Sequence, residues 1–246
     1  MSKVIYLYDQ NNSVSKDKIY EILLNFFKSI STNLIIIFFN YFFNDSLSTN
    51  DSIEINSKTL NINNYIPLDY SLSSINFTIN NETLYSLEID SSAKNNFSLH
   101  LLKYKKINKD ENYFINLPET KILELENNTS TPEKYSYKVK LYNHLLSYDV
   151  PIYKLHNINL DFIKDNNLYI LFPFSLFNSY NKITNSSKIG SNTENLQKEV
   201  LKLSEISYKN IRKLNAYNSS FTKKDYCILK DTIGEIIDYY LESLEE

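Results

Sequence analysis

The sequence predicts a mixed fold of the α/β (α+β) class, with a mixed central sheet flanked by helices and a pair of helices at the C-terminus. Two patterns predict this fold class. In the middle of the chain apolar residues alternate with polar ones, as in Ile75-Asn-Phe-Thr-Ile79, which is the spacing of half-buried strands. Nearer the two ends apolar residues recur every three or four positions, as between Ile19 and Ile30, which is the spacing of amphipathic helices.

Each element in the first half follows from a local signal. Residues 15–18 can cap a first helix that begins near Asp17, and the apolar run from Leu34 to Phe43 predicts a second, buried helix. Asn80-Asn-Glu82 supplies turn chemistry between two alternating stretches, which predicts an antiparallel hairpin. In order, we then expect short strand pieces from Ile53 to Ile62, hairpin strands at Ile75–Ile79 and Tyr85–Ile89, and a helix from about Ser91 to Lys106.

The second half begins with a β pattern and ends with helical spacing. We expect strands at Tyr113–Leu117, Lys121–Leu125, Tyr135–Tyr142 and Tyr148–Leu155, a helical turn at Leu160–Asp165, and a buried strand or short helix at Leu168–Phe177. Residues 181–193 are rich in Ser, Asn and Lys and are expected to form a linker. Helical spacing then predicts a C-terminal helical region over residues 194–246, with a structural or dimer-forming role.

Composition limits the function classes. The 246 residues are 42% hydrophobic, enough for one large domain or one domain with a helical appendage. A net charge of −3 gives no overall attraction to nucleic acid, so such binding would need local basic patches, as at residues 103–106 or 209–213. The simpler interpretation of each patch is a solvated helix face.

The chain carries one cysteine, Cys227, which excludes an internal disulfide framework and is expected to be a small core residue. The N-terminus lacks the features of a signal peptide, and residues 34–43 are too short a run to span a bilayer. We therefore expect a cytoplasmic protein with no membrane partner. Neither a Gly-rich phosphate loop nor a nucleophile elbow is found, and the three histidines are scattered.

Two acids on the second hairpin strand form the candidate site. Residues two apart on a strand share a face, so Glu88 and Asp90 project side by side, roughly 7 Å apart. Two such carboxylates repel each other unless they are solvated or hold a cation, and hard cations such as Mg²⁺ prefer oxygen ligands. The alternative is an exposed edge strand whose polar residues face solvent.

Three later segments, taken in order, carry a family resemblance. They are Thr131-Pro132 after a strand pattern, Val150-Pro-Ile-Tyr-Lys154, and Phe172-Pro-Phe174. Their order and spacing resemble the recombination-promoting nuclease family, also described as PD-(D/E)XK nuclease family transposases. The resemblance implies a restriction-endonuclease-like core in residues 1–180, Mg²⁺- or Mn²⁺-dependent DNA endonuclease activity in DNA recombination, and DNA as partner. A homodimer is expected of an enzyme that cuts both strands.

The resemblance also assigns site residues. It places Glu88 on the Glu of the family's Glu-x-Gln motif and Tyr104 on a helix tyrosine. Three departures follow: Asp90 stands where the family has Gln, His100 where it has Arg, and Ser74 where it has the first acid, which leaves Asp69 as an upstream substitute. The implied metal-binding and catalytic acids are Asp69, Glu88 and Asp90, and the implied DNA contacts are His100, Lys103 and Tyr104.

These departures leave three hypotheses open. The first is an endonuclease with impaired or intact catalysis. The second is a catalytically inactive relative that binds DNA or a protein, and the third is an interaction protein with no role on nucleic acid. The three acids meeting around one point would favour the first hypothesis.

Overall fold

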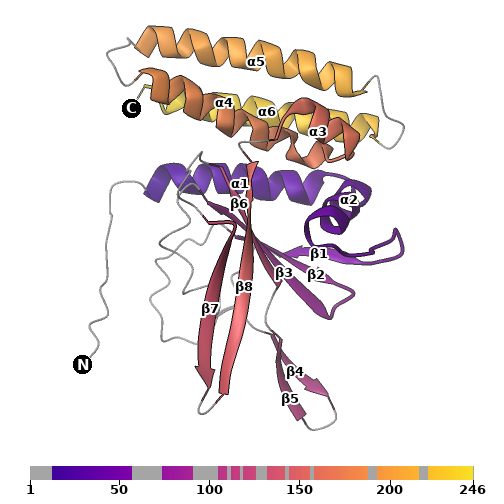
Figure 1. The fold of residues 1–246 in the computed structure, drawn as a ribbon. Helices are drawn as coiled ribbons and strands as arrows, with labels where there is room; N and C mark the ends of the chain where they lie inside the picture. Colours follow the sequence, from indigo (N-terminus) through magenta and orange to yellow (C-terminus); the bar gives the residue numbers. More distant parts are fainter. Residues whose placement is uncertain are drawn as a thin grey trace, which may run out of the picture.

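Figure 1 shows the computed structural model of the chain, which describes most of the predicted elements. The described residues are 13–56, 74–90, 105–109, 112–116, 119–125, 132–141, 144–155, 158–187, 193–215 and 221–245. The helices are α1 (Ser13–Ser29), α2 (Thr32–Phe42), α3 (Leu160–Asp165), the 3-10 helix η3 (Tyr169–Leu171), α4 (Phe172–Ser187), α5 (Thr193–Asn215) and α6 (Lys223–Glu242). The strands are β1 (Ile53–Asn56), β2 (Ser74–Ile79), β3 (Thr83–Asp90), β4 (Lys105–Lys109), β5 (Asn112–Asn116), β6 (Glu119–Glu124), β7 (Lys134–Leu141) and β8 (His144–Lys154).

Six strands form one mixed sheet in the order β1-β2-β3-β6-β8-β7. Strands β1, β2 and β3 form an antiparallel meander, β6 pairs parallel to both β3 and β8, and β7 closes the sheet antiparallel to β8. Strands β4 and β5 form a separate hairpin. The mixed sheet and its flanking helices confirm the predicted α+β class at this level.

The β2–β3 hairpin forms as its sequence predicts. Asn80 and Asn81 adopt the left-handed backbone conformation, with φ of 52° and 59°, which asparagine tolerates better than most residues. The Asn80 side chain donates to Asp51 Oδ1 at 2.8 Å, and its carbonyl oxygen accepts from the backbone N–H of Ser52 at 3.0 Å. The turn is therefore tied to the loop that precedes β1.

Helices α1 and α2 bury one face of the sheet in an aromatic core. The ring of Phe77 on β2 meets Phe27 of α1 edge to face at 5.7 Å and Phe39 of α2 at 4.9 Å, and Phe39 also meets Tyr85 of β3 at 5.1 Å. Such T-shaped pairs add about 0.5–1.5 kcal/mol each beyond their area burial. This geometry explains why the alternating apolar positions Ile75–Ile79 of β2 and Tyr85–Ile89 of β3 face the helices.

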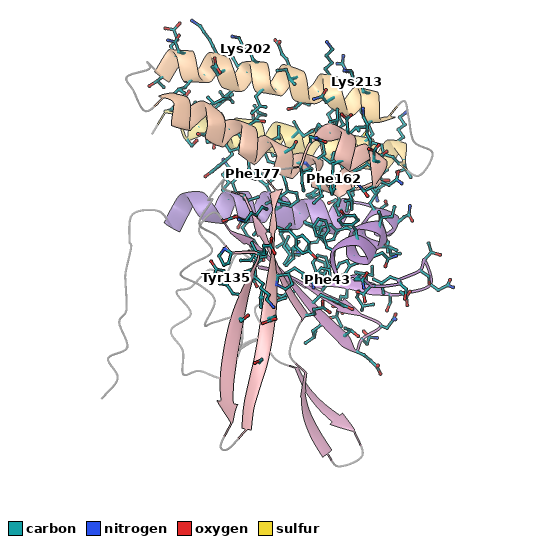
Figure 2. All side chains as sticks on the ribbon, in the orientation of Figure 1. Phe43, Tyr135, Phe162, Phe177, Lys202 and Lys213 are labelled. Atoms are coloured by element: carbon teal, nitrogen blue, oxygen red, sulfur yellow. The ribbon has the colours of Figure 1, made fainter. Side chains whose placement is uncertain are left out.

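Helices α4, α5 and α6 form a further layer on the outer side of α1, and α5 is the outermost helix (Figure 1). Their apolar faces belong to the same continuous core as the sheet and α1, as the buried residues Phe174, Val200 and Ile233 show. The labelled side chain of Phe177 lies where α4 meets this core (Figure 2).

The structure differs from the sequence predictions in three places. Residues 105 and 106 begin strand β4, so the helix expected up to Lys106 does not include them. Residues 181–187 continue α4 where a linker was expected, whereas the helical structure of residues 169–177 is one of the two predicted alternatives. Cys227 is exposed instead of belonging to the core. Within the described ranges, no single helix is long and apolar enough to cross a membrane; α1 and α2 meet those criteria only together, bent by 111°.

Candidate metal centre on the central strands

The structure describes one predicted site residue in full. Glu88 lies in the C-terminal half of β3. Asp90 ends the same strand, and only its backbone position is described. Asp69 and the expected DNA contacts His100, Lys103 and Tyr104 lie outside the described residues, so the predicted meeting of Asp69 with Glu88 stays a prediction.

Strand β3 has one apolar and one polar face, and both are covered. Its apolar face, with Leu87 at the centre, packs on α1 and α2. On the other face Ser86 is fully buried and Glu88 is only 4% exposed. The alternative of an exposed edge strand is therefore wrong, because β3 lies in the interior of the sheet between β2 and β6.

A second buried acid, Glu124 of β6, lies on the same face. Strand β6 runs parallel to β3, in a register that pairs Glu88 with Ile122 and Asp90 with Glu124. Register partners in neighbouring strands project to the same face of a sheet, so Glu124 is a diagonal neighbour of Glu88. Glu124 is 1% exposed. Sequence reasoning missed this residue, although a charged residue at the end of an otherwise apolar strand pattern was an available signal.

The third parallel strand, β8, adds a lysine to these acids, and the four residues Glu88, Asp90, Glu124 and Lys154 are called here the polar row. The register of β6 with β8 pairs Glu124 with Lys154, which is half-buried. Asp90, Glu124 and Lys154 therefore occupy one level across β3, β6 and β8. Sequence reasoning used Lys154 only as part of a family motif and gave it no role in the site.

The polar row borders an apolar patch of the same sheet face. Ile122, Val150 and Ile152 are buried together there, with Tyr135 of β7 packed against them (Figure 2). Low polarity beside the acids strengthens every electrostatic interaction in the site. The site therefore combines two carboxylates and one ammonium group in a largely desolvated setting.

Hydrogen bonding and charge tie Glu88 to its surroundings. Ser86 Oγ donates to Glu88 Oε1 at 2.8 Å. Burial raises the pKa of the Tyr20 phenol on α1, and the charge of Glu88 raises it further. Tyr20 thus stays protonated at neutral pH and lies within electrostatic reach of the carboxylate.

The donor set suits a hard divalent cation. Removing two carboxylates from water costs several kcal/mol each in the absence of compensating charge, and Lys154 supplies one positive charge beside them. Oxygen ligands favour Mg²⁺ or Mn²⁺ over zinc. Among the side chains that the structure describes, no group of three or more His, Cys, Asp or Glu is placed to hold an ion, so the described part of the site offers two carboxylates.

Comparisons with known proteins do not extend this description. No protein-family model matches the chain, and no significant match is found among curated proteins or solved structures. The buried polar row and the order of the sequence motifs are therefore the two features that bear on function.

Proposed function

We propose that this chain is a divalent-metal-dependent DNA endonuclease-like protein that hydrolyses phosphodiester bonds at the polar face of its central strands. The observation that carries the proposal is the burial of Glu88 and Glu124 on one face of two adjacent parallel strands. The order of strands supports the finer expectation of a restriction-endonuclease-like core, since an antiparallel meander, β1-β2-β3, is followed by a strand parallel to β3.

The residues present fit a magnesium or manganese ion. Glu88 and Glu124 would hold it, with Asp90 next to Glu124 in the register, and magnesium sites use one or two carboxylates with water and phosphate oxygens. When bound, such an ion polarises a phosphoryl oxygen and lowers the pKa of a coordinated water.

Lys154 supplies the hydrogen-bond donor that is missing at position 90, where the chain has Asp90 in place of the glutamine that the resemblance implies. The family resemblance places an amide donor at that position, and an ionised Asp90 cannot donate a hydrogen bond. Lys154 lies one strand further, beside Glu124, and provides a cation that stabilises negative charge developing on a phosphate. Ser86 orients Glu88 through its 2.8 Å hydrogen bond to one carboxylate oxygen.

A second candidate is a catalytically inactive relative that binds DNA or a protein partner. It is favoured by position 74, which is the register partner of Glu88 and carries serine where the resemblance places the first acid. Loss of that acid would reduce ion affinity while leaving the sheet intact.

Plasmid nicking tests the proposal. Wild-type protein is incubated with supercoiled plasmid in Mg²⁺, Mn²⁺ or EDTA, beside Glu88→Gln and Glu124→Gln, which keep the shape of each side chain. Glu119→Gln is the matched control, because Glu119 lies at the start of β6 on the opposite sheet face and is exposed. We expect metal-dependent nicking by wild type and the control, with at least about a hundredfold loss in both site variants.

Binding of Mn²⁺, measured by calorimetry, separates the two candidates. Nicking that survives both site variants would refute this location of the active centre. Ion binding without nicking by the wild type would favour the inactive relative, and absence of both would refute the proposed metal centre.

A further inference from the structure

Helices α5 and α6 divide their exposed charge between two opposite ends. The C-terminal half of α5 (residues 204–215) and the N-terminal half of α6 (residues 223–232) carry six exposed cations and two exposed carboxylates among the described residues. The charge balance is reversed in the other two halves, residues 193–203 and 233–245, where the described residues include two exposed lysines and six exposed carboxylates. The cations of the first set, called here the basic end, are Lys209, Arg212, Lys213, Lys223, Lys224 and Lys230.

The two helices bring these cations to one end of the outer layer. Helix α5 packs antiparallel on α6, so the C-terminus of α5 lies beside the N-terminus of α6 (Figure 1). The labelled residues Lys202 and Lys213 lie on α5, the outermost helix, with Lys213 toward the end of α5 that lies beside the start of α6 (Figure 2). At 1.5 Å per residue, Lys223 to Lys230 span about 10 Å, so the surface is wide enough to face several phosphates.

The cations of the basic end form no ion pairs with described carboxylates. Elsewhere in these layers lysines are paired: Lys198 Nζ lies 2.8 Å from Glu194 Oε1 on α5, and Lys18 of α1 pairs with Glu242 of α6. The positive charge of the basic end is therefore available to an external anion.

The placement of two of these lysines opposes helix stability. Thr222 is the N-cap of α6, and Lys223 and Lys224 occupy the first two positions of its first turn. Cations there face the positive end of the helix dipole, an unfavourable arrangement of about 0.3–1 kcal/mol per charge. Arg212 and Lys213 have an ordinary explanation, because they complement the C-terminus of α5. No such stabilisation by the helix dipole explains Lys223 and Lys224. An external anion bound there would be attracted both by the two lysines and by the positive end of the helix dipole.

We propose that the basic end binds the phosphate backbone of duplex DNA, as an anchoring surface separate from the polar row of the sheet. The choice of DNA as the polyanion rests on the proposed function. A second copy of the chain is the other oppositely charged candidate, since its acidic end would complement the basic end. An antiparallel pairing of two copies would also set each basic end against an acidic end and close as a dimer, so self-association is an outcome of the test. DNA is the chosen occupant because the proposed function gives the chain a duplex substrate.

Fluorescence anisotropy of a labelled 20-base-pair duplex tests this surface in EDTA, where hydrolysis cannot interfere. Binding is measured from 50 to 300 mM NaCl for wild type and for the triple variant Lys209→Ala, Arg212→Ala, Lys213→Ala. The matched control is Lys198→Ala, Lys202→Ala, at the other end of the same helix face. We expect the triple variant to weaken binding at least about tenfold at 50 mM and to reduce the log–log salt slope by about 3, one per lost phosphate contact.

Further variants separate this inference from the proposed hydrolysis. Lys223→Ala, Lys224→Ala should also weaken binding and raise thermal stability, because it removes the opposed charges. Binding in EDTA does not depend on hydrolysis, so a failure of nicking alone leaves the anchoring surface supported.

Three results would overturn the inference: equal weakening by the control pair, unchanged binding in the triple variant, or tighter binding of duplex RNA than of DNA. Salt-sensitive dimers or larger assemblies seen by light scattering without DNA would assign the surface to a second copy instead.

Discussion

Asp225 joins the C-terminal layer to the N-terminal helices, and its removal should destabilise the whole protein. The side chain is 0% exposed. Its Oδ1 accepts from the backbone N–H of Ser31 at 2.9 Å, at the start of α2. Its Oδ2 accepts from the backbone N–H and hydroxyl of Thr222, at 3.1 and 2.6 Å, within the capping box of α6. One carboxylate thus satisfies donors from two helix termini, although Ser31 and Asp225 lie 194 positions apart in sequence.

We expect Asp225→Ala to lower the free energy of unfolding by about 3 kcal/mol. Loss of the capping box costs about 1 kcal/mol, and leaving the half-buried N–H of Ser31 without its charged acceptor costs about 2 more. For a chain of this size that is roughly a 10 °C drop in Tm. Asp225→Asn keeps the shape and one acceptor, so we expect about half the loss.

Equilibrium unfolding in urea measures these differences, with two controls at the same joint. Thr222→Ala removes only the cap and should cost about 1 kcal/mol. Ser31→Ala retains the backbone N–H that Asp225 accepts from, and the Ser31 hydroxyl makes no hydrogen bond among the described residues, so we expect a change below about 0.5 kcal/mol. An Asp225→Ala loss no greater than that of Thr222→Ala would refute the proposed joint.

Two further predictions concern single hydroxyl and carboxyl groups. Tyr240 is buried, and its hydroxyl has no hydrogen-bond partner within the described part of the chain. Tyr240→Phe should therefore leave the free energy of unfolding unchanged or raise it by about 1 kcal/mol. A decrease of more than about 1 kcal/mol, measured by urea unfolding, would contradict this. Tyr180→Phe, which removes the 3.0 Å hydrogen bond to Ser243, is its matched comparison and should be destabilising. Hydrogen bonds from Asn80 and then Ser48 lower the pKa of the exposed Asp51 below 3.8, so its contribution is complete above pH 3.8 and is lost as the pH falls through the lowered value. The stability gap between wild type and Asp51→Asn should therefore stay constant well above pH 3.8 and narrow as the pH falls below it, and a gap that widens would exclude this role.

Local patterns in the sequence determined the individual elements. Alternation specified the strands β2 and β3, and the asparagine pair specified the turn between them. Helical spacing specified α1, α5 and α6, and a continuous apolar run specified α2. These signals are local because each depends on backbone geometry repeated over two to four residues. Local patterns also placed Glu88 opposite the apolar face of β3, which is the part of the site that could be predicted.

Only the tertiary structure decided what surrounds Glu88. Parallel pairing of β3 with β6 and of β6 with β8 brings Glu124 and Lys154 onto its sheet face, and it makes β3 an interior strand. No periodicity within a strand specifies which distant strand becomes its neighbour or in what register. That choice minimises the exposed apolar surface of the whole chain, and it is made by long-range packing against α1 and α2.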